Sequence, residues 1–482
     1  MFDIPFLPSL LALPLVGALC VSFVPAQNGY TAKTVGLGFS CLTFLYSLFL
    51  WIGFHDGIAD FQYASEVSWG PLSIHFGVDG VSLFFLLLTT LLVPLCLLTG
   101  WASVQHSVKE YCVLFLLMET MMLGVFCILD VLFFYIFFEA VLLPMYLIIG
   151  IWGSRERRIK AAYTFFLYTL LGSVFMLLGL LALYLEAGTT DLHILLATPF
   201  SEKRQIILWI AFFASFAVKV PMLPVHIWLP EAHVEAPTAG SVVLAGVLLK
   251  LGTYGFLRFS LPLFPYASLY FTPFIFVLSV VGILYASCTT LRQVDLKKII
   301  AYSSVAHMNF VTLGLFSGTL QGIEGAIMLM LSHGFVSSAL FLCIGVLYDR
   351  YKTRLLQYYG GCVHTMPLFA VLFLFFTLGN LSLPGTSAFV GEFMLLTGVY
   401  QTNTFICFLA ALGMILGAAY SLWLYNRVVF GHMKMAHSFT TSDVNRREFW
   451  TFFPLIVCTL WMGVFPEVFL DSIHSSVSWY LP

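Results

Sequence analysis

Long apolar runs, separated by short polar segments, make up most of this chain of 482 residues. An apolar helix needs about 20 residues to cross a bilayer, and it satisfies its own backbone hydrogen bonds in hydrocarbon. The pattern therefore predicts an all-α polytopic membrane protein in which residues 1–482 form a single transmembrane domain. The fourteen runs of sufficient length cover residues 6–24, 35–54, 81–99, 111–129, 131–152, 161–185, 206–229, 236–259, 272–291, 299–316, 323–348, 366–400, 404–430 and 449–470.

Two of the runs contain helix breakers beside a charged residue. In AVKVPMLPVHIWLPEA, residues 217–232, three prolines follow Lys219, and in LSLPGTSAFVGEF, residues 381–393, a Pro-Gly pair precedes Glu392. Interrupted apolar segments at matching positions of two halves are typical of transport sites in inverted-repeat folds. We expect broken helices 7 and 12, and two inverted five-helix repeats formed by spans 4–8 and 9–13. The corresponding regions are residues 1–110 for helices 1–3, 111–260 for the first repeat, 261–430 for the second and 431–482 for the last helix.

The placement of basic residues tests the count of fourteen spans. The chain is 60% hydrophobic and 9% charged, whereas soluble domains carry about 25% charged residues. The face reached after even-numbered spans holds Lys203, Arg204 and Arg258, the last of these at the very end of its span, and Lys219 and Lys250 lie deeper within spans. By the positive-inside rule, both termini should face outward, with the basic loops on the cytoplasmic or matrix side. The remaining 16 of the 21 basic residues lie after odd-numbered spans or at their ends: Lys33, Lys109, Arg155, Arg157, Arg158, Lys160, Arg292, Lys297, Lys298, Arg350, Lys352, Arg354, Arg427, Lys434, Arg446 and Arg447.

Ionisable side chains at membrane depth are the main candidates for function. A charged side chain in the middle of the bilayer costs about 3 kcal/mol, so a set of them indicates pairing, access to water, or a functional use. Seven residues are placed at this depth by the predicted spans: Glu119, Glu139, Lys219, Lys250, His307, His333 and Glu392.

Glu139 and Lys219 are predicted to form a pair that exchanges protons. A carboxylate favours the charged form of a nearby lysine, while burial favours the neutral form, so a change in their separation can move a proton. Glu139 lies in FFYIFFEAVLLPMY, about one turn before Pro144. A structural ion pair that holds two helices together is the alternative. Lys250, in VVLAGVLLKLGTYGF, lies about 14 residues into its span, which argues against a lysine that snorkels to the interface.

His307 and His333 lie in the middle of neighbouring spans. Histidine titrates near neutral pH and suits a proton relay, and serines on the same spans can position water. Glu392 follows the predicted break by about eight residues and completes this second group. A histidine that only packs in a helix interface is one alternative, and a bis-histidine haem site is another.

Three further residues can be explained by a purely structural role as well as by a functional one. Glu119, in LLMETMML, fits a hydrogen-bonded structural glutamate as well as a relay member. His226 and His233 have an i, i+7 spacing around Pro230 that is poor metal-ligand geometry, and we interpret them as a boundary loop. The ten cysteines contain no CxxC or CxxxC pair, so the pattern indicates neither a zinc site nor a disulfide framework.

Five stretches carry a resemblance to a known family. They are AFFASFAVKVPMLPVHIWLPEAHVEAPTAGSVVLAGVLLKLGTYGFLRFSLPLFP, TLRQVDLKKIIAYSSVAHMNFVTLG, LSHGFVSSALF, YYGG and LSLPGTSAFVGEF. They resemble the antiporter-like subunit 4 family of respiratory complex I, whose bacterial counterpart is subunit M. The resemblance is strongest to the plant and algal mitochondrial forms. The resemblance implies fourteen helices with two inverted repeats, and it carries the proton-pathway roles onto Glu139, Lys219, Lys250, His307, His333 and Glu392. Sister subunits have lysine at the position of Glu392, which favours subunit 4.

The resemblance also implies activity, cofactors, partners and location. The expected function is proton translocation in the membrane arm of H⁺-translocating NADH:ubiquinone oxidoreductase. No redox centre or metal is expected on this chain, because FMN, iron–sulfur clusters and ubiquinone belong to other subunits. Its partners would be the other membrane-arm subunits including the neighbouring antiporter-like ones, membrane lipids, protons and water, with no nucleic acid. The expected location is the mitochondrial inner membrane, with both termini on the intermembrane-space side, or else the bacterial plasma membrane.

Three other functions fit the same pattern less fully. A subunit of a Mrp-type cation/proton antiporter would share the repeat and its buried lysines. A structural membrane spacer would use the buried charges only to hold helices together, and a haem-carrying electron-transfer subunit would use the histidines as ligands.

Overall fold

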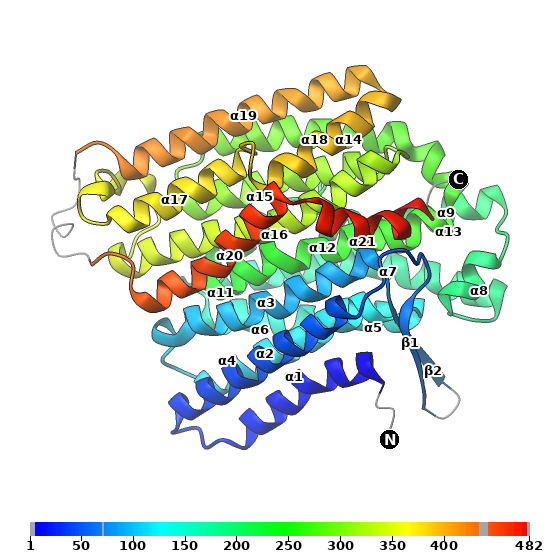
Figure 1. Ribbon diagram of the computed structural model, residues 1–482, viewed down its shortest axis with the longest axis horizontal. Helices are drawn as coiled ribbons and strands as arrows, with labels where there is room; N and C mark the ends of the chain where they lie inside the picture. Colours follow the sequence, from blue (N-terminus) through cyan, green and yellow to red (C-terminus); the bar gives the residue numbers. More distant parts are fainter. Residues whose placement is uncertain (1–4, 70–71, 433–441, 480–482) are drawn as a thin grey trace. The chain divides into compact units, whose positions relative to one another are not determined.

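Helices account for nearly all of the secondary structure in the computed structural model, which describes residues 5–69, 72–432 and 442–479 (Figure 1). The α-helices are α1 (Phe6–Phe23), α2 (Gly29–Ile52), α3 (Gly80–Ser103), α4 (Val108–Cys127), α5 (Val131–Ala140), α6 (Leu142–Trp152), α7 (Arg158–Ala187), α8 (Leu192–Ala197), α9 (Glu202–Lys219), α10 (Trp228–Glu235), α11 (Thr238–Val243), α12 (Leu249–Gly255), α13 (Leu261–Leu263), α14 (Pro265–Arg292), α15 (Leu296–Leu315), α16 (Leu320–Tyr351), α17 (Pro367–Asn380), α18 (Ser387–Thr402), α19 (Thr404–Val429), α20 (Arg446–Val464) and α21 (Glu467–Ser478). Two π-helical turns, η1 (Leu244–Leu248) and η2 (Phe256–Ser260), and two 3₁₀ turns, η3 (Leu356–Tyr358) and η4 (Cys362–His364), complete the helical structure. The chain is therefore a mostly helical protein, as its apolar pattern predicts.

The helices form two compact units. Unit 1 comprises Met1–Val220, Val247–Thr272 and Leu470–Pro482, and unit 2 comprises Pro221–Gly246 and Pro273–Phe469. Unit 1 contains α1–α9 and α12, and unit 2 contains α10, α11 and α15–α20. Each unit holds some of the predicted site residues, so the site is described below one unit at a time.

Ten helical segments among the described residues are long and apolar enough to cross a membrane, or eleven if α20 and α21 count as one broken span. The chain is thus a multi-pass membrane protein. The predicted spans that fall outside this count correspond to α9, to α15, and to α17 with α18. These three carry Lys219, His307 and Glu392.

Polar N-caps mark where one apolar run ends and the next helix begins. Asp130 separates two runs that almost touch, and its carboxylate accepts hydrogen bonds from the backbone N–H groups of Leu132 (2.9 Å) and Phe133 (3.0 Å) at the start of α5. Asp295 and Thr319 cap α15 and α16 in the same way. Such caps satisfy N–H groups that have no acceptor within the helix, so the boundaries are set by local sequence.

A β-hairpin in the connection between α2 and α3 was not predicted. Strand β1 (Gln62–Trp69) pairs antiparallel with β2 (Leu72–Val78), with Ser65 opposite Phe76 and Val67 opposite Ile74. Figure 1 shows the two strands as neighbouring arrows. The alternation of polar and apolar residues is short here, and the apolar runs on either side dominate the hydropathy pattern.

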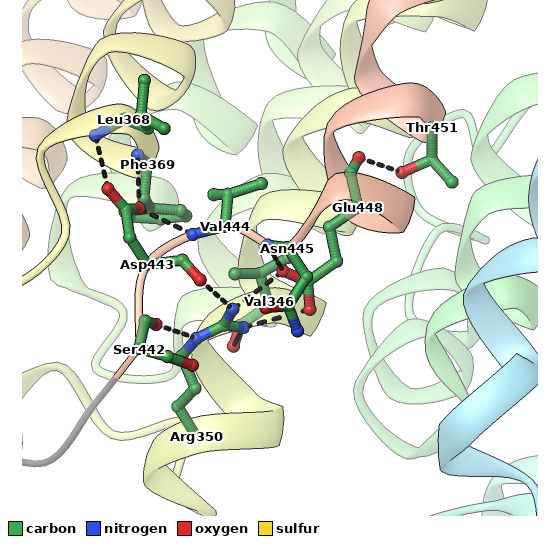
Figure 2. A network of polar contacts seen from close by, with 10 residues as sticks. All are labelled: Val346, Arg350, Leu368, Phe369, Ser442, Asp443, Val444, Asn445, Glu448 and Thr451. Carbon is green, nitrogen blue, oxygen red and sulfur yellow. Dashed lines mark hydrogen bonds and ion pairs between the residues drawn. The ribbon is translucent and has the colours of Figure 1, made fainter.

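An arginine network ties three helices of unit 2 together near their ends (Figure 2). Arg350 of α16 donates to both carboxylate oxygens of Glu448 in α20, at 3.2 and 2.8 Å, and to three backbone carbonyls. Asp443 accepts from the N–H groups of Leu368 (2.9 Å) and Phe369 (3.2 Å) at the start of α17. Because a guanidinium donates in fixed directions, this network sets the mutual position of α16, α17 and α20.

Three basic residues assigned to loop faces are buried instead. Arg258 is 2% exposed and donates to the Asp79 carboxylate at 2.6 Å. Lys297, 4% exposed, donates to the carbonyl of Ala236 at 2.7 Å. A count of charge along the chain does not reveal this burial, because it depends on acceptors supplied by distant segments.

The third is Arg354, which is 1% exposed. It lies 3.7 Å from a Glu235 carboxylate oxygen and 4.0 Å from one of Asp295, and it also donates to the carbonyl of Val234. Lys434, which the charge pattern also placed in a basic loop, lies outside the described residues.

Candidate functional site

Lys219 is held at the end of a helix that stops in the middle of an apolar run. Helix α5 ends at Ala140, and Pro144, which has no N–H to donate to the Ala140 carbonyl, lies in the first turn of α6. The last carbonyls of α5 therefore need hydrogen-bond donors from outside the helix. Lys219 Nζ donates to one of them, the Phe138 carbonyl, at 3.1 Å, and lies 4.0 Å from the centroid of the Phe138 ring.

The surroundings of Lys219 favour its positive charge in three ways. The C-terminal end of a helix carries partial negative charge, and Lys219 lies at the ends of both α5 and its own helix α9. The aromatic face of Phe138 adds a cation–π interaction. Glu139 supplies a further electrostatic interaction. A lysine that is only 3% exposed can thus be charged at this position.

Glu139 lies near Lys219 but does not form an ion pair with it. Among the described residues, no nitrogen of Lys219 comes within 4.0 Å of the carboxylate, and Glu139 Oε1 has no hydrogen-bond partner. Glu139 is only partly buried. The two groups therefore interact across a gap, which is the arrangement in which a small movement changes their electrostatic coupling.

Lys250 lies on a helix that packs closely against α9. It is fully buried on α12, between the π-helical turns η1 and η2, and such wide turns are frequent at functional sites. Two residues later, a Cβ placed on Gly252 would come within 2.9 Å of Lys219 Cβ and 3.1 Å of the Phe216 carbonyl. Only glycine lets α12 approach α9 this closely. Glu139 and Lys219 form what we call the Lys219 centre, and Lys250 lies on the helix that packs against it, two residues from the Gly252 contact.

A second group, the His307 centre, comprises His307, His333 and Glu392 in unit 2. His307 Nδ1 lies 3.1 Å from Glu392 Oε1, and the rings of His307 and His333 are 5.8 Å apart between centroids. The three residues come from α15, α16 and α18 and are 3–7% exposed. Unlike the Lys219 centre, this one contains a direct contact between an acid and a titratable base.

A small cavity opens beside the two histidines. It has a volume of about 10 Å³ and is lined by His307, Leu329, Ser332, His333, Val336, Gly379, Asn380 and Ala388. This is close to the room that one water molecule needs. His307 lines this cavity, and its Nε2 has no hydrogen-bond partner among the described residues.

The interruption between α17 and α18 forms part of the same centre. Gly385 adopts a left-handed φ of +93°, which glycine allows without steric cost. On one side Asn380 donates to the Ser421 hydroxyl at 3.2 Å, and on the other Ser387 shares a hydrogen bond of 2.8 Å with Ser332 of α16. The break is thus flanked by buried polar side chains that form hydrogen bonds with neighbouring helices.

Glycines bring α16 and α18 into backbone contact around Glu392. A Cβ on Gly391 would meet the backbone nitrogen of Leu329 at 2.6 Å, and a Cβ on Gly325 would meet that of Leu395 at 2.4 Å. Small residues allow such close helix packing within membranes. The position of Glu392 is therefore fixed by backbone packing.

The structure brings Glu139 close to Lys219, and it brings His307 close to His333 and Glu392. Lys250 lies two residues from the contact between α12 and α9, and Glu119 lies on another helix. Glu119, on α4, shares a hydrogen bond with the Thr43 hydroxyl of α2. His226 lies in the turns after α9, as the interpretation of a boundary loop requires. For His233 that interpretation is wrong. It is fully buried on α10 and stacks on Phe341 with 4.5 Å between centroids, because α10 continues through Pro230 in its first turn.

Two buried ionic groups were missed by the sequence analysis. They are the Arg258–Asp79 pair and the cluster of Lys297, Arg354, Asp295 and Glu235. The signal that could have found them is an acidic residue next to a helix start, since both aspartates are N-caps. No cluster of three or more metal-ligand side chains occurs in the part of the chain that the structure describes.

Comparisons with known proteins agree on one family. Residues 128–418 match the family profile described as "NADH:quinone oxidoreductase/Mrp antiporter, TM", and residues 11–129 match "NADH-ubiquinone oxidoreductase chain 4, amino terminus". The chain is 63% identical to NADH-ubiquinone oxidoreductase chain 4 of Marchantia polymorpha, over 98% of this chain and 96% of that protein. It is 51% identical to NADH-quinone oxidoreductase subunit M of Rhodobacter capsulatus, over 97% and 94%.

Solved structures show the same fold. A chain of respiratory complex I from Thermus thermophilus superposes with a TM-score of 0.90 at 32% identity, covering 98% of both chains. A chain of the Mrp complex from Dietzia sp. gives a TM-score of 0.86 at 20% identity, covering 98% of this chain and 97% of that one, which is a likeness of fold alone. The chain belongs to the NADH-ubiquinone oxidoreductase chain 4 family.

Proposed function

We propose that this chain is a proton-translocating membrane-arm subunit of respiratory complex I, in which NADH:ubiquinone electron transfer drives proton pumping. The observation that carries this function is the 63% identity over 98% of the chain to a relative named chain 4. The two centres supply residues that suit the task. The enzyme is H⁺-translocating NADH:ubiquinone oxidoreductase, of which this chain is one subunit.

The finer architecture is part of the proposal. The ten long apolar helical segments, the α20–α21 pair, α9, α15 and the α17–α18 pair together make fourteen spans. The helix breaks after Lys219 and after Asn380 support the assignment of helices 7 and 12 as broken, and of spans 4–8 and 9–13 as inverted repeats. Both termini would then lie on the intermembrane-space side of the mitochondrial inner membrane.

In the proposed mechanism, the two centres hold and release protons in sequence. Protons would enter near the Glu139–Lys219 pair, pass through Lys250 and the region of His307 and His333, and leave towards Glu392. Lys219 releases a proton when its coupling to Glu139 weakens, since a buried lysine is stable as the charged form only while nearby groups favour that charge. His307 can pass a proton to Glu392 across 3.1 Å, which is hydrogen-bond distance.

FMN, iron–sulfur clusters and ubiquinone are proposed to belong to other subunits, so this chain performs no redox step. Its proposed partners are the other membrane-arm subunits, including the neighbouring antiporter-like ones, membrane lipids, water and protons. Electron transfer elsewhere would act on the Lys219 centre through charge and helix movement.

The test is Glu139→Gln in the assembled complex, reconstituted into liposomes. The substitution keeps the size of the side chain and removes its charge, and it should lower NADH:ubiquinone turnover and proton pumping together by about tenfold, equivalent to about 1.4 kcal/mol in the barrier. Glu156→Gln, an exposed glutamate in the loop after α6, is the matched control and should leave both rates unchanged. Undiminished pumping by the Glu139 variant would remove this residue from the mechanism.

A subunit of a Mrp-type antiporter is the second candidate, because the matched family profile includes both groups in its description. Affinity purification of the chain from its own membranes decides between them. Co-purification with NADH:ubiquinone reductase activity supports complex I, and co-purification with cation/proton exchange but no quinone reduction supports the antiporter.

A further inference from the structure

Glu119 is a fully buried acid that neither centre uses. It is 0% exposed on α4, where α4 packs against α1, α2 and α3 within unit 1. Its Oε1 lies 2.8 Å from the Thr43 hydroxyl of α2, and its Oε2 has no hydrogen-bond partner among the described residues. No basic side chain in the described ranges forms an ion pair with it.

The free energy of burial disfavours an ionised Glu119. A carboxylate in the hydrocarbon region costs about 3 kcal/mol even by the mildest scales, and here no cation offsets that cost. The other titratable groups that interact with it electrostatically are the thiols of Cys41 on α2 and Cys96 on α3. Neither thiol supplies a positive charge, so the neutral acid is the favoured form.

The hydrogen-bond geometry points to the same form. Thr43 Oγ1 lies 2.8 Å from the Ser40 carbonyl and 2.8 Å from Glu119 Oε1, yet a hydroxyl has only one proton to donate. Both contacts are satisfied at once if the Glu119 acid donates to Thr43 Oγ1 while Thr43 donates to Ser40. With an ionised Glu119, one of the two acceptors would be left without its hydrogen.

The face of α2 toward its neighbours carries a row of hydroxyls. Its buried positions are Ala32, Gly36, Ser40, Thr43, Ser47 and Leu50, which recur every three or four residues and so lie on one side of the helix. Ser47 shares a hydrogen bond of 2.8 Å with Thr90 of α3. Hydroxyls both donate and accept, so this row offers Glu119 a polar route for its proton through an otherwise apolar bundle.

We propose that Glu119 is a further proton-binding site, a neutral carboxylic acid that exchanges its proton through the α2 hydroxyl row. A purely structural role would need only the hydrogen bond, as the Ser47–Thr90 pair shows, and would be served equally by an amide. The proposal concerns the protonation of one side chain, so it does not depend on the pumping role proposed above.

The test is an infrared difference spectrum of the assembled complex. The complex with native Glu119 should show the C=O stretch of a protonated carboxylic acid that Glu119→Gln removes, and this band should shift to lower frequency in D₂O. If the substitution instead removes a carboxylate band, Glu119 is ionised and the proposal is overturned. A protonated band that never shifts in D₂O would overturn the exchange.

A second variant keeps the test informative if Glu119→Gln fails to assemble. Thr43→Val retains the acid but removes its hydrogen-bond partner, so the same C=O band should move to higher frequency. Thr89→Val is the matched control, because the Thr89 hydroxyl donates only to the Leu86 carbonyl of its own helix. A band that responds equally to both valine variants, or to neither, would contradict the assignment to Glu119.

Discussion

Lys219 and Glu392 each lie beside an interruption in a helix, yet the partners that hold them differ in kind. Lys219 Nζ donates to a backbone carbonyl, and its carboxylate neighbour Glu139 remains beyond ion-pair distance. Glu392 is in direct contact with the His307 ring at 3.1 Å. The carbonyl at Lys219 cannot take up a proton, whereas the His307 contact joins two groups that can each bind one.

The difference follows from what each break supplies. The break after α5 leaves carbonyl oxygens, which attract a cation but cannot take a proton. The break between α17 and α18 leaves Asn380 and Ser387 near a cavity that has room for about one water. We infer that the Lys219 centre responds to electrostatic change and that the His307 centre conducts the proton.

The largest effect is expected from Lys219→Arg. Arginine keeps the positive charge and the cation–π contact, but it does not deprotonate in proteins. Turnover of NADH:ubiquinone and pumping should both fall by about tenfold or more, although the charge is preserved. Rates are measured per assembled complex, quantified on native gels. Normal rates would mean that the centre needs only a fixed charge, and the contrast with the His307 centre would disappear.

An intermediate effect is expected from alanine at the two close helix contacts. Gly391→Ala places a methyl group 2.6 Å from the backbone nitrogen of Leu329, whereas Gly252→Ala meets the Val220 side chain first, at 2.8 Å. Overpacking costs about 1–3 kcal/mol, and the backbone clash should cost more because a side chain yields more easily. The amount of assembled complex should therefore fall for both variants, and it should fall further for Gly391→Ala than for Gly252→Ala.

Gly38→Ala serves as the control for this pair. Gly38 lies on α2, and a Cβ there would meet no atom within 4 Å. Assembly of this variant should equal that of the unsubstituted chain. If Gly391→Ala assembles as well as Gly38→Ala does, backbone packing does not set the position of Glu392.

The smallest effect is expected from His307→Gln. The amide group of glutamine can still donate a hydrogen bond to Glu392 but cannot carry a proton in turn. The loss of one titratable member should cost about 1 kcal/mol in the barrier, or about fivefold in turnover, since His333 and the cavity remain. His307→Phe, which also removes the hydrogen bond, should be worse. Equal rates for the two variants would show that the contact with Glu392 has no role.

Sequence reasoning could predict much of the candidate site because its signals are local. Lys219 and Glu392 are conspicuous as charges in apolar runs, and Pro144 and Gly385 mark points where a helix is interrupted. Arg354 shows the limit, since its neighbours along the chain are polar and suggest a loop, while Glu235, Asp295 and a distant backbone carbonyl bury it. Glu119 shows the same limit of sequence reasoning, because its hydroxyl partner, Thr43, lies 76 residues away in the chain.

The amino-acid sequence is enough to predict that the chain is helical, where most of its helices begin and end, and which acids and bases lie within apolar runs. Each of these depends on residues within one or two turns, because hydrocarbon requires every helix to satisfy its own backbone. Which groups these acids and bases contact depends on the tertiary structure. Lys219 meets a carbonyl 81 residues away, and His307 meets a carboxylate 85 residues away. Such pairings depend on how closely the helices pack, which at Gly252 and Gly391 is set by the absence of a side chain.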